Sequence, residues 1–138
     1  MSSSVACIAY ENNRIFIAKR QNVGDMGGHW EFPGGKIDEG ETAADAIKRE
    51  MMEEFGVETQ VIAKLGSAQF THKDVVCTVD AYYVKFSHDG LETPFTLTEH
   101  TEYRWVKPEE ILDYKFVDSD LKLYPEVMTA IQNNKLKV

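Results

Sequence analysis

The pattern of hydrophobic and polar positions predicts a series of β-strands with one long amphipathic helix among them. Two runs rich in β-branched and apolar residues, at 5–10 and 14–20, flank Glu11-Asn12-Asn13, a combination typical of a hairpin. Residues 75–86 alternate with a period of two, which predicts a long strand. Shorter strands are expected at 30–32, 59–65, 66–71 and 103–106, with turns or loops at 21–29, 33–35, 87–90 and 91–101.

The amphipathic helix is expected between Ala43 and Phe55. Thr42 precedes it as a candidate N-cap, and Gly56 follows it as a stop signal. At about 100° per residue, the apolar side chains form one stripe, which predicts the face that packs against the core. The members of the stripe are Ala44, Ile47, Met51 and Phe55.

The order of these elements predicts an α+β fold. Strands are expected both before and after the helix, and two further helices are expected at 107–112 and 125–133. The polar run Asp118-Ser119-Asp120 is typical of a turn or a helix cap. The 138 residues contain no internal repeat and no linker-like segment, so a single domain over 1–138 is expected.

Composition narrows the classes of partner. The formal net charge of −8 disfavours binding to long nucleic acids and to anionic membranes, and an anionic substrate would need local cations. We expect a cytoplasmic protein, because the sequence shows neither a signal peptide nor a membrane span. Cys7 and Cys77 are expected to be reduced. We expect either a monomer or a homodimer.

The helix also carries a cluster of carboxylates, Glu50, Glu53 and Glu54. Residues three or four apart on a helix are neighbours, and like charges there repel by roughly 0.2–0.5 kcal/mol per pair. Glu54 falls on the flank of the apolar stripe rather than on a solvated face. A divalent cation would offset both costs, since Mg²⁺ takes oxygen ligands. The alternative is a surface helix rich in glutamate.

The spacing around this helix is more specific than the helix itself. Gly35 is followed after five residues by Glu41, and after seven more by Arg49-Glu50-Met51-Met52-Glu53-Glu54-Phe55-Gly56-Val57. This arrangement resembles the Nudix box, G-x5-E-x7-R-E-U-x-E-E-x-G-U, in which U is a bulky apolar residue. Every defined position of that pattern is filled between Gly35 and Val57.

The resemblance extends to the MutT-type branch of the Nudix hydrolases. It includes WEFPGGKI at 30–37, Lys19-Arg20 and the segment 105–110. It implies an α/β/α sandwich around a mixed β-sheet. It also implies hydrolysis of a nucleoside triphosphate, such as 8-oxo-dGTP, CTP or dCTP, to a monophosphate and pyrophosphate. The implied cofactor is Mg²⁺, for which Mn²⁺ is expected to substitute.

The resemblance assigns metal-binding roles to the box. Glu50 and Glu54 would coordinate Mg²⁺ together with the carbonyl group of Gly34. Glu53 would act through a water molecule or on a second metal ion. Glu41 and Arg49 would pair to hold the loop on the helix. The glycines with structural roles in the motif are Gly35 and Gly56.

A further glutamate outside the box is expected to complete the metal site or to serve as the base. Counting back from Trp105 favours Glu99, with Glu102 as the alternative. Either Glu53 or Glu99 would remove a proton from the attacking water.

Substrate contacts are expected from residues on both sides of the box. Arg20 and Lys36 are candidates for contacts with phosphate, and Phe32 is a candidate for stacking on the base. Asp118 matches the position expected to read the base, and a helix cap is its alternative role. Alternative substrates are ADP-ribose or a nucleotide sugar, and a non-catalytic nucleotide-sensing module is the alternative function.

Overall fold

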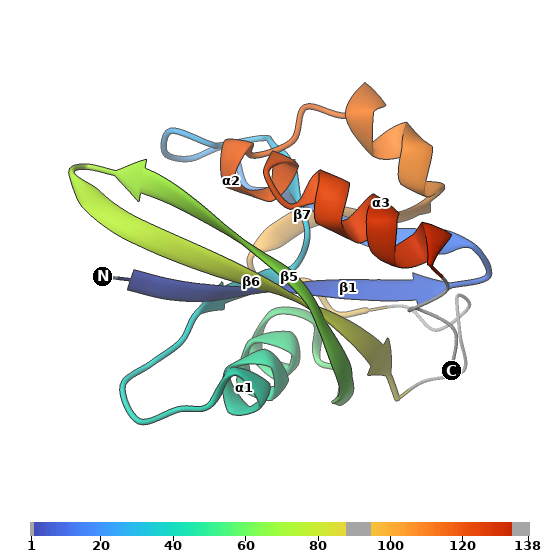
Figure 1. Cartoon of the computed structure of the whole chain (residues 1–138), viewed down its shortest axis with the longest axis horizontal. Coiled ribbons are helices and arrows are strands. Elements are labelled where there is room, and N and C mark those ends of the chain that lie inside the picture. Colours follow the sequence, from blue (N-terminus) through green and yellow to red (C-terminus); the bar gives the residue numbers. More distant parts are fainter. Residues whose placement is uncertain (1, 88–94, 134–138) are drawn as a thin grey trace.

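The computed structural model describes residues 2–87 and 95–133. Its strands are β1 (Ser2–Glu11), β2 (Arg14–Arg20), β3 (Trp30–Glu31), β4 (Gly34–Lys36), β5 (Thr59–His72), β6 (Val75–Phe86) and β7 (His100–Val106). Its helices are α1 (Ala43–Phe55), the 3-10 helix η2 (Pro108–Asp113), α2 (Asp118–Leu121) and α3 (Tyr124–Gln132). Figure 1 shows β1 running through the middle of the molecule.

β1 is the strand around which the mixed sheet is arranged. It pairs in parallel with β6, from Ser2 opposite Cys77 to Ala9 opposite Val84, and antiparallel with β4. Its last residues pair with β2, which pairs in turn with β3 and β7. The main strand order is β3-β2-β1-β6-β5. A parallel pair requires a crossover connection, and α1 lies within the one that joins β1 to β6.

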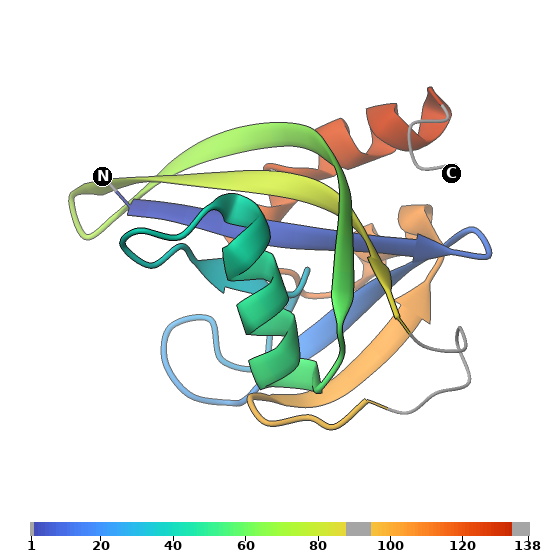
Figure 2. The ribbon, with the colours of Figure 1, turned by 90° about the horizontal axis from the view of Figure 1, so that it is seen from below.

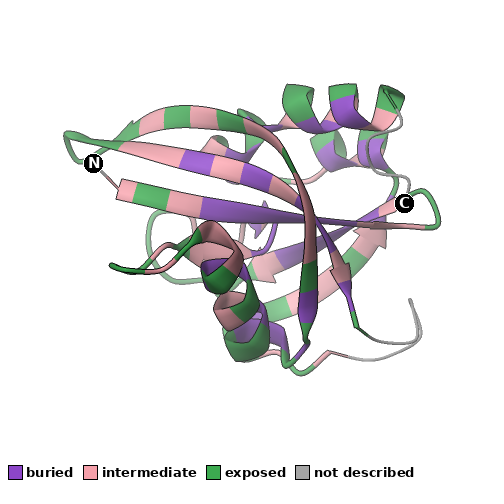
Figure 3. Ribbon diagram, turned by 60° about the horizontal axis from the view of Figure 1, so that its bottom comes forward, coloured by how far each residue is buried: buried purple, intermediate pink, exposed green. Residues whose placement is uncertain are grey.

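Helices cover both faces of this sheet. α1 lies on one face, and α2 and α3 lie on the other (Figures 1 and 2). Successive side chains of a strand point to opposite faces, so Val5 and Cys7 of β1 belong to the cluster with Met51, whereas Ile8 belongs to the cluster with Leu123. Figure 3 shows the buried stretch of β1 between these layers. The predicted α+β class, an α/β/α sandwich with a mixed sheet, is confirmed.

The segments expected at 59–65 and 66–71 form one strand, β5, rather than two. It pairs with β6 along its whole length, with register shifts between Val61 and Ala63 and between Lys64 and Gly66. Gly66 therefore does not end the strand. A Cβ atom there would lie 2.8 Å from the Cβ atom of Glu126, so glycine permits α3 to approach β5 closely.

Two short elements also differ from the sequence-based expectation. The glycine pair expected in a turn forms β4, in which Gly34 and Gly35 pair with β1. Asp118-Ser119-Asp120, expected as a turn, begins the short helix α2. The expected turn at 87–90 and connection at 91–101 lie partly outside the described residues, which stop at 87 and resume at 95. None of the described helices is long and apolar enough to cross a membrane.

Candidate active site

Helix α1 is held at both ends by the capping residues that the sequence indicated. The Thr42 hydroxyl accepts a hydrogen bond of 3.1 Å from the Asp45 backbone N–H. At the other end, Gly56 adopts a left-handed conformation (φ 66°), and its N–H donates to the Met52 carbonyl at 3.0 Å. The caps fix the bounds of the helix and hence the direction in which its carboxylates point.

These carboxylates line a cleft of about 510 Å³. It lies where α1, the β3–β4 segment, the start of β7 and α2 meet, and its walls are mostly polar. Its acidic lining residues are Glu31, Glu50, Glu53, Glu54, Glu99 and Asp120. The cleft therefore gathers residues from segments that are far apart in the sequence.

Glu54 is the most deeply buried carboxylate of this cluster, with 2% of its surface exposed. Burial raises the pKa of Glu54 to about 10, and the nearby carboxylates of Glu50, Glu99 and Glu31 add to the shift. Within the described part of the chain, no hydrogen-bond partner exists for Glu54 Oε2. A buried carboxylate oxygen that lacks a donor, beside further carboxylates, suits a divalent cation.

Gly34 and the first residue of the box, Gly35, allow close approaches around this carboxylate cluster. At Gly35, a Cβ atom would lie 2.6 Å from the carboxylate carbon of Glu50. At Gly34, a Cβ atom would collide with the carbonyl oxygen of Val5 in β1. Glycine at both positions thus lets β4 sit between β1 and the acidic end of the cleft.

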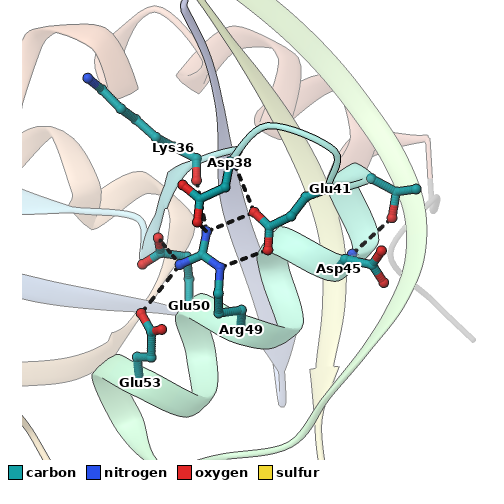
Figure 4. A network of polar contacts seen from close by, with 8 residues as sticks. Lys36, Asp38, Glu41, Asp45, Arg49, Glu50 and Glu53 are labelled. Carbon is teal, nitrogen blue, oxygen red and sulfur yellow. Dashed lines mark hydrogen bonds and ion pairs between the residues drawn. The ribbon is translucent and has the colours of Figure 1, made fainter.

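Arg49 lies among the acidic side chains and contacts several of them at once (Figure 4). Its Nε and Nη2 donate to the two carboxylate oxygens of Glu41 at 2.7 and 2.9 Å. Its Nη1 donates to Glu50 at 3.0 Å and to Glu53 at 3.3 Å, and Nη2 also donates to the Lys36 carbonyl at 3.1 Å. The repulsion within the acidic cluster is therefore offset in part by an arginine of the same helix.

Glu41 is the carboxylate most strongly tied to Arg49. The hydrogen bonds from Arg49 and from the Asp38 N–H lower the pKa of Glu41 to about 2. Glu41 therefore carries its negative charge throughout the neutral range, and it fixes the loop between β4 and α1 against the helix.

Glu99 reaches the cleft because the segment before β7 binds the last turn of α1. The Thr98 hydroxyl donates to the Glu53 carbonyl at 2.8 Å, and the Thr98 N–H donates to the Glu54 carbonyl at 3.3 Å. Glu99 is exposed and lines the cleft. Glu102 pairs with Arg104 at 3.6 Å and is absent from the cleft lining.

The residues expected to contact the substrate are distributed along the walls of the cleft. Arg20, Phe32 and Lys36 all line it. Arg20 is 44% exposed and forms an ion pair of 3.1 Å with Glu31, whereas Phe32 is buried and packs edge-on against Phe116 at 5.0 Å. Lys36 is exposed.

Asp118 lies outside the cleft, whereas Asp120 lies inside it. Asp118 is exposed at the start of α2 and is not among the lining residues. Asp120 is 7% exposed, lines the cleft, and accepts a hydrogen bond of 2.9 Å from the Phe32 N–H. Residues two apart on a helix project to opposite sides, which accounts for the difference. Burial, reinforced by the charge of Glu31, raises the pKa of Asp120 to about 8.

Two functional candidates, Glu31 and His100, were not identified from the sequence. His100 Nε2 lies 2.8 Å from Glu31 Oε2, and His100 Nδ1 lies 3.7 Å from Glu54 Oε1. One ligand atom from each of Glu31, Glu54 and His100 falls within 4.8 Å of the others, so these side chains form a group suited to a metal ion. The sequence offered two signals for them. Glu31 is an acidic residue between two aromatic residues of a short strand, and His100 directly follows Glu99.

Comparison with known proteins places this chain in a family. A family model described as the NUDIX domain matches residues 2–127. The chain is 32% identical over 128 residues to the CTP pyrophosphohydrolase of Escherichia coli (strain K12), covering 93% of this chain and 92% of that protein. It is 36% identical over 77 residues to the 8-oxo-dGTP diphosphatase of Proteus vulgaris, covering 56% of this chain and 69% of that protein.

Solved structures agree with these matches. The solution structure of the E. coli ORF135 protein superimposes with a TM-score of 0.84 at 30% identity, covering 96% of this chain and 92% of that one. The crystal structure of the MutT protein from Methanosarcina mazei Go1 has a TM-score of 0.78 at 22% identity, covering 97% and 95%, and shows the fold alone. The family model spans nearly the whole chain, including the cleft and the complete box, and the chain therefore belongs to the NUDIX family of hydrolases.

Proposed function

We propose that this Nudix hydrolase cleaves a nucleoside triphosphate into a nucleoside monophosphate and pyrophosphate in a Mg²⁺-dependent reaction. The observation that carries the proposal is the buried Glu54 carboxylate, whose unpaired Oε2 belongs to a cleft lined also by Glu50, Glu53 and Glu99. The relatives named CTP pyrophosphohydrolase and 8-oxo-dGTP diphosphatase support a nucleotide as the substrate class.

The metal ion would be held by Glu50 and Glu54, with the Gly34 carbonyl and Glu53 as further oxygen ligands. Divalent metal ions are typical of this family, and the acidic cleft supplies the hard oxygen ligands that Mg²⁺ prefers. When bound, Mg²⁺ neutralises charge on phosphoryl oxygens and lowers the pKa of water. We expect Mn²⁺ to substitute, because it accepts the same carboxylate and carbonyl oxygens.

Glu99 is the carboxylate best suited to accept the proton of the attacking water. Its rival Glu53 is already engaged by Arg49, whose Nη1 donates a hydrogen bond to it at 3.3 Å. No hydrogen bond to the Glu99 side chain is seen among the described residues, and Glu99 is exposed within the cleft. A base must also reach the water in the bound complex, and the Thr98 contacts keep Glu99 beside the carboxylates of α1.

Positive charge in the cleft would receive the phosphates. The protein carries a net charge of −8, so a triphosphate requires local cations to approach. Arg20 and Lys36 both line the cleft, and Arg20 is held in place by its ion pair with Glu31. We propose that they contact the phosphate chain alongside the metal ion.

The remaining walls of the cleft suit a nucleobase. Phe32 and Phe70 supply aromatic surface and Val79 supplies aliphatic surface. Asp120, whose raised pKa favours the neutral acid at pH 7, can both donate and accept hydrogen bonds there. We propose that Asp120, rather than Asp118, reads the polar edge of the base.

The proposal is tested by assaying purified protein with a panel of nucleotides and identifying the products. The panel contains CTP, dCTP, dGTP, 8-oxo-dGTP, ADP-ribose and a nucleoside diphosphate sugar, each with Mg²⁺. We expect pyrophosphate and a monophosphate from at least one triphosphate, at a higher kcat/KM than from either diphosphate compound. Preferred cleavage of ADP-ribose or the sugar nucleotide would contradict the proposed substrate class. Absence of all turnover would indicate a nucleotide-sensing module.

A further inference from the structure

His100 is a buried histidine at the start of β7, and the reaction proposed above assigns it no role. Its side chain is 2% exposed, and its ring stacks on Phe55 with a centroid distance of 5.1 Å and an interplanar angle of 19°. Phe55 is the last residue of α1 and is buried in the core cluster on which the helix packs. The imidazole is therefore packed directly against the helix that carries the carboxylates.

One ring nitrogen of His100 has a well-defined partner. Nε2 lies 2.8 Å from Glu31 Oε2, and the other carboxylate oxygen of Glu31 accepts from Arg20 Nη1 at 3.1 Å. Glu31 therefore has a cationic partner on one carboxylate oxygen, and its other oxygen can accept a hydrogen bond from the imidazole. In the neutral imidazole, this contact favours the tautomer with the ring proton on Nε2 and a lone pair on Nδ1.

Nδ1 lies near Glu54 but forms no hydrogen bond with it. Nδ1 lies 3.7 Å from Glu54 Oε1, which is beyond hydrogen-bond distance. Among the described residues, both His100 Nδ1 and Glu54 Oε2 are buried with no hydrogen-bond partner. Buried polar atoms without a hydrogen-bond partner are costly, and a cation bound between the two side chains would remove this cost.

The arrangement matches the way in which histidines ligate metal ions. A ligating imidazole generally donates its second N–H to a carboxylate, which fixes the tautomer and orients the ring. Glu31 supplies that carboxylate here, and Nδ1 is the nitrogen left for a metal. The 3.7 Å between Nδ1 and Glu54 Oε1 is shorter than two metal–ligand bonds of about 2.1 Å laid end to end, so one ion can reach both atoms.

We propose that His100 Nδ1 is a nitrogen ligand of the metal centre, which it shares with Glu54, and that Glu31 orients it. Imidazole suits transition-metal ions such as Zn²⁺, Fe²⁺ and Ni²⁺, whereas Mg²⁺ prefers oxygen ligands; Mn²⁺ accepts the same oxygens as Mg²⁺ but, as a transition-metal ion, also takes a nitrogen ligand. His100 therefore raises the affinity of the site for such ions relative to Mg²⁺. The inference rests on the metal-dependent function proposed above and adds to it a ligand that the box does not contain.

Pulsed electron paramagnetic resonance of the Mn²⁺-loaded protein tests this ligation directly. We expect electron spin-echo modulation from a directly bound ¹⁴N nucleus, and we expect labelling with ¹⁵N-histidine to replace it with the ¹⁵N pattern. This comparison uses the wild-type sequence and needs no variant to fold. Bound Mn²⁺ without histidine-dependent modulation would overturn the inference while leaving the metal-dependent function intact. A protein that binds no Mn²⁺ would contradict both.

Substitutions identify which histidine is responsible. His100→Phe preserves the ring stacked on Phe55 and should abolish the nitrogen modulation. His72→Phe changes an exposed histidine of β5 that lies outside the cleft, and it should leave the signal unchanged. Persistence of the signal in His100→Phe, or its loss in His72→Phe, would refute the assignment.

Metal affinity supplies a second measurement that does not depend on turnover. Titration calorimetry with Mn²⁺ and Mg²⁺ should show that His100→Phe weakens Mn²⁺ binding more than Mg²⁺ binding. Glu31→Gln should weaken Mn²⁺ binding by about 10–100-fold, because it removes the carboxylate that orients the imidazole. An unchanged ratio of the two affinities in His100→Phe would contradict the proposal.

Discussion

Arg49 holds Glu41 through two hydrogen bonds at once, with Nε 2.7 Å from one carboxylate oxygen and Nη2 2.9 Å from the other. This bidentate pair joins the loop before α1 to the middle of the helix. The same guanidinium contacts Glu50 and Glu53, so one side chain both anchors the loop and reduces the repulsion among the helix carboxylates. The residues beside the proposed metal ligands are thus positioned before any metal binds.

The Glu41–Arg49 pair should make stability depend on pH in the acid range. The pKa of Glu41 falls from 4.5 to about 2 in the folded protein, so its stabilising contribution is complete above pH 4.5 and is lost as the pH falls toward 2. Glu41→Gln should therefore have a lower Tm than the wild type at pH 6, and the gap should close between pH 4.5 and 2. Thermal melts across this range provide the measurement.

Glu39 offers a matched control for that experiment. It is an exposed carboxylate of the same loop, and Glu39→Gln should melt within about 1 °C of the wild type at every pH, as expected for a neutral surface change. A gap between Glu41→Gln and the wild type that stays constant from pH 6 to pH 2 would contradict the proposed linkage.

Glu54 should produce the opposite pH dependence in the metal-free protein. Its pKa rises from 4.5 to about 10, so its contribution to stability is complete below pH 4.5 and declines as the pH rises toward 10. In EDTA, the Tm of the wild type relative to Glu54→Gln should therefore fall steadily from pH 5 to pH 10. Saturating Mg²⁺ should reduce this decline, because the ionised carboxylate is then a ligand. Parallel curves for the two proteins in EDTA would refute the burial argument.

Glu99 and Glu102 should differ sharply when each is changed to glutamine. Glu99 lines the cleft, whereas Glu102 pairs with Arg104 outside it. Glu99→Gln should lower kcat by about a hundredfold or more, which is the range for the loss of a general base. Glu102→Gln should stay near the wild-type rate. Equal rates for the two variants in a steady-state assay would remove Glu99 from the mechanism.

Asp120 and Asp118 should differ in their effect on substrate choice. Asp120→Asn keeps the volume and the hydrogen bond to Phe32 but changes the pattern of donors and acceptors. It should change kcat/KM for the preferred nucleotide relative to the others by about 1–3 kcal/mol, or roughly 5–150-fold. Asp118→Asn lies on the exposed side of α2 and should leave the relative values unchanged. The reverse outcome would restore Asp118 as the base-reading residue.

The sequence predicted the parts of the site that are set by spacing within a single segment. Helix α1 has the predicted bounds, with Thr42 and Gly56 at its ends, because caps depend on residues only a few positions away. The burial of Glu54 also agrees with its angular position beside the apolar stripe. The family resemblance added Glu99 as a candidate outside the box, and Glu99 lines the cleft.

The parts that depend on contacts between distant segments could not be predicted in the same way. Glu31 of β3 and His100 of β7 meet because both strands pair with β2. The pairing of β2 with β7 also contains a register shift between Lys19 and Arg20, next to His100. No local pattern encodes which strands become neighbours. Asp120 was missed for a related reason. The triplet Asp118-Ser119-Asp120 is equally compatible with an exposed turn and with a short helix that buries one side, and only the packing of α2 distinguishes the two.

The rate of pyrophosphate release by Glu54→Gln, measured with Mg²⁺ and the best triphosphate of the panel, tests the central claim most directly. The substitution replaces the ionisable side chain of a proposed ligand with a neutral one of the same size. We predict a loss of at least about a hundredfold in kcat, because a ligand of the ion that stabilises phosphoryl charge is removed. The matched variant Glu58→Gln, at an exposed position just after α1, should remain near the wild-type rate, and excess EDTA should abolish wild-type turnover. A Glu54→Gln enzyme that keeps the wild-type rate, or a wild type that is indifferent to EDTA, would contradict the account.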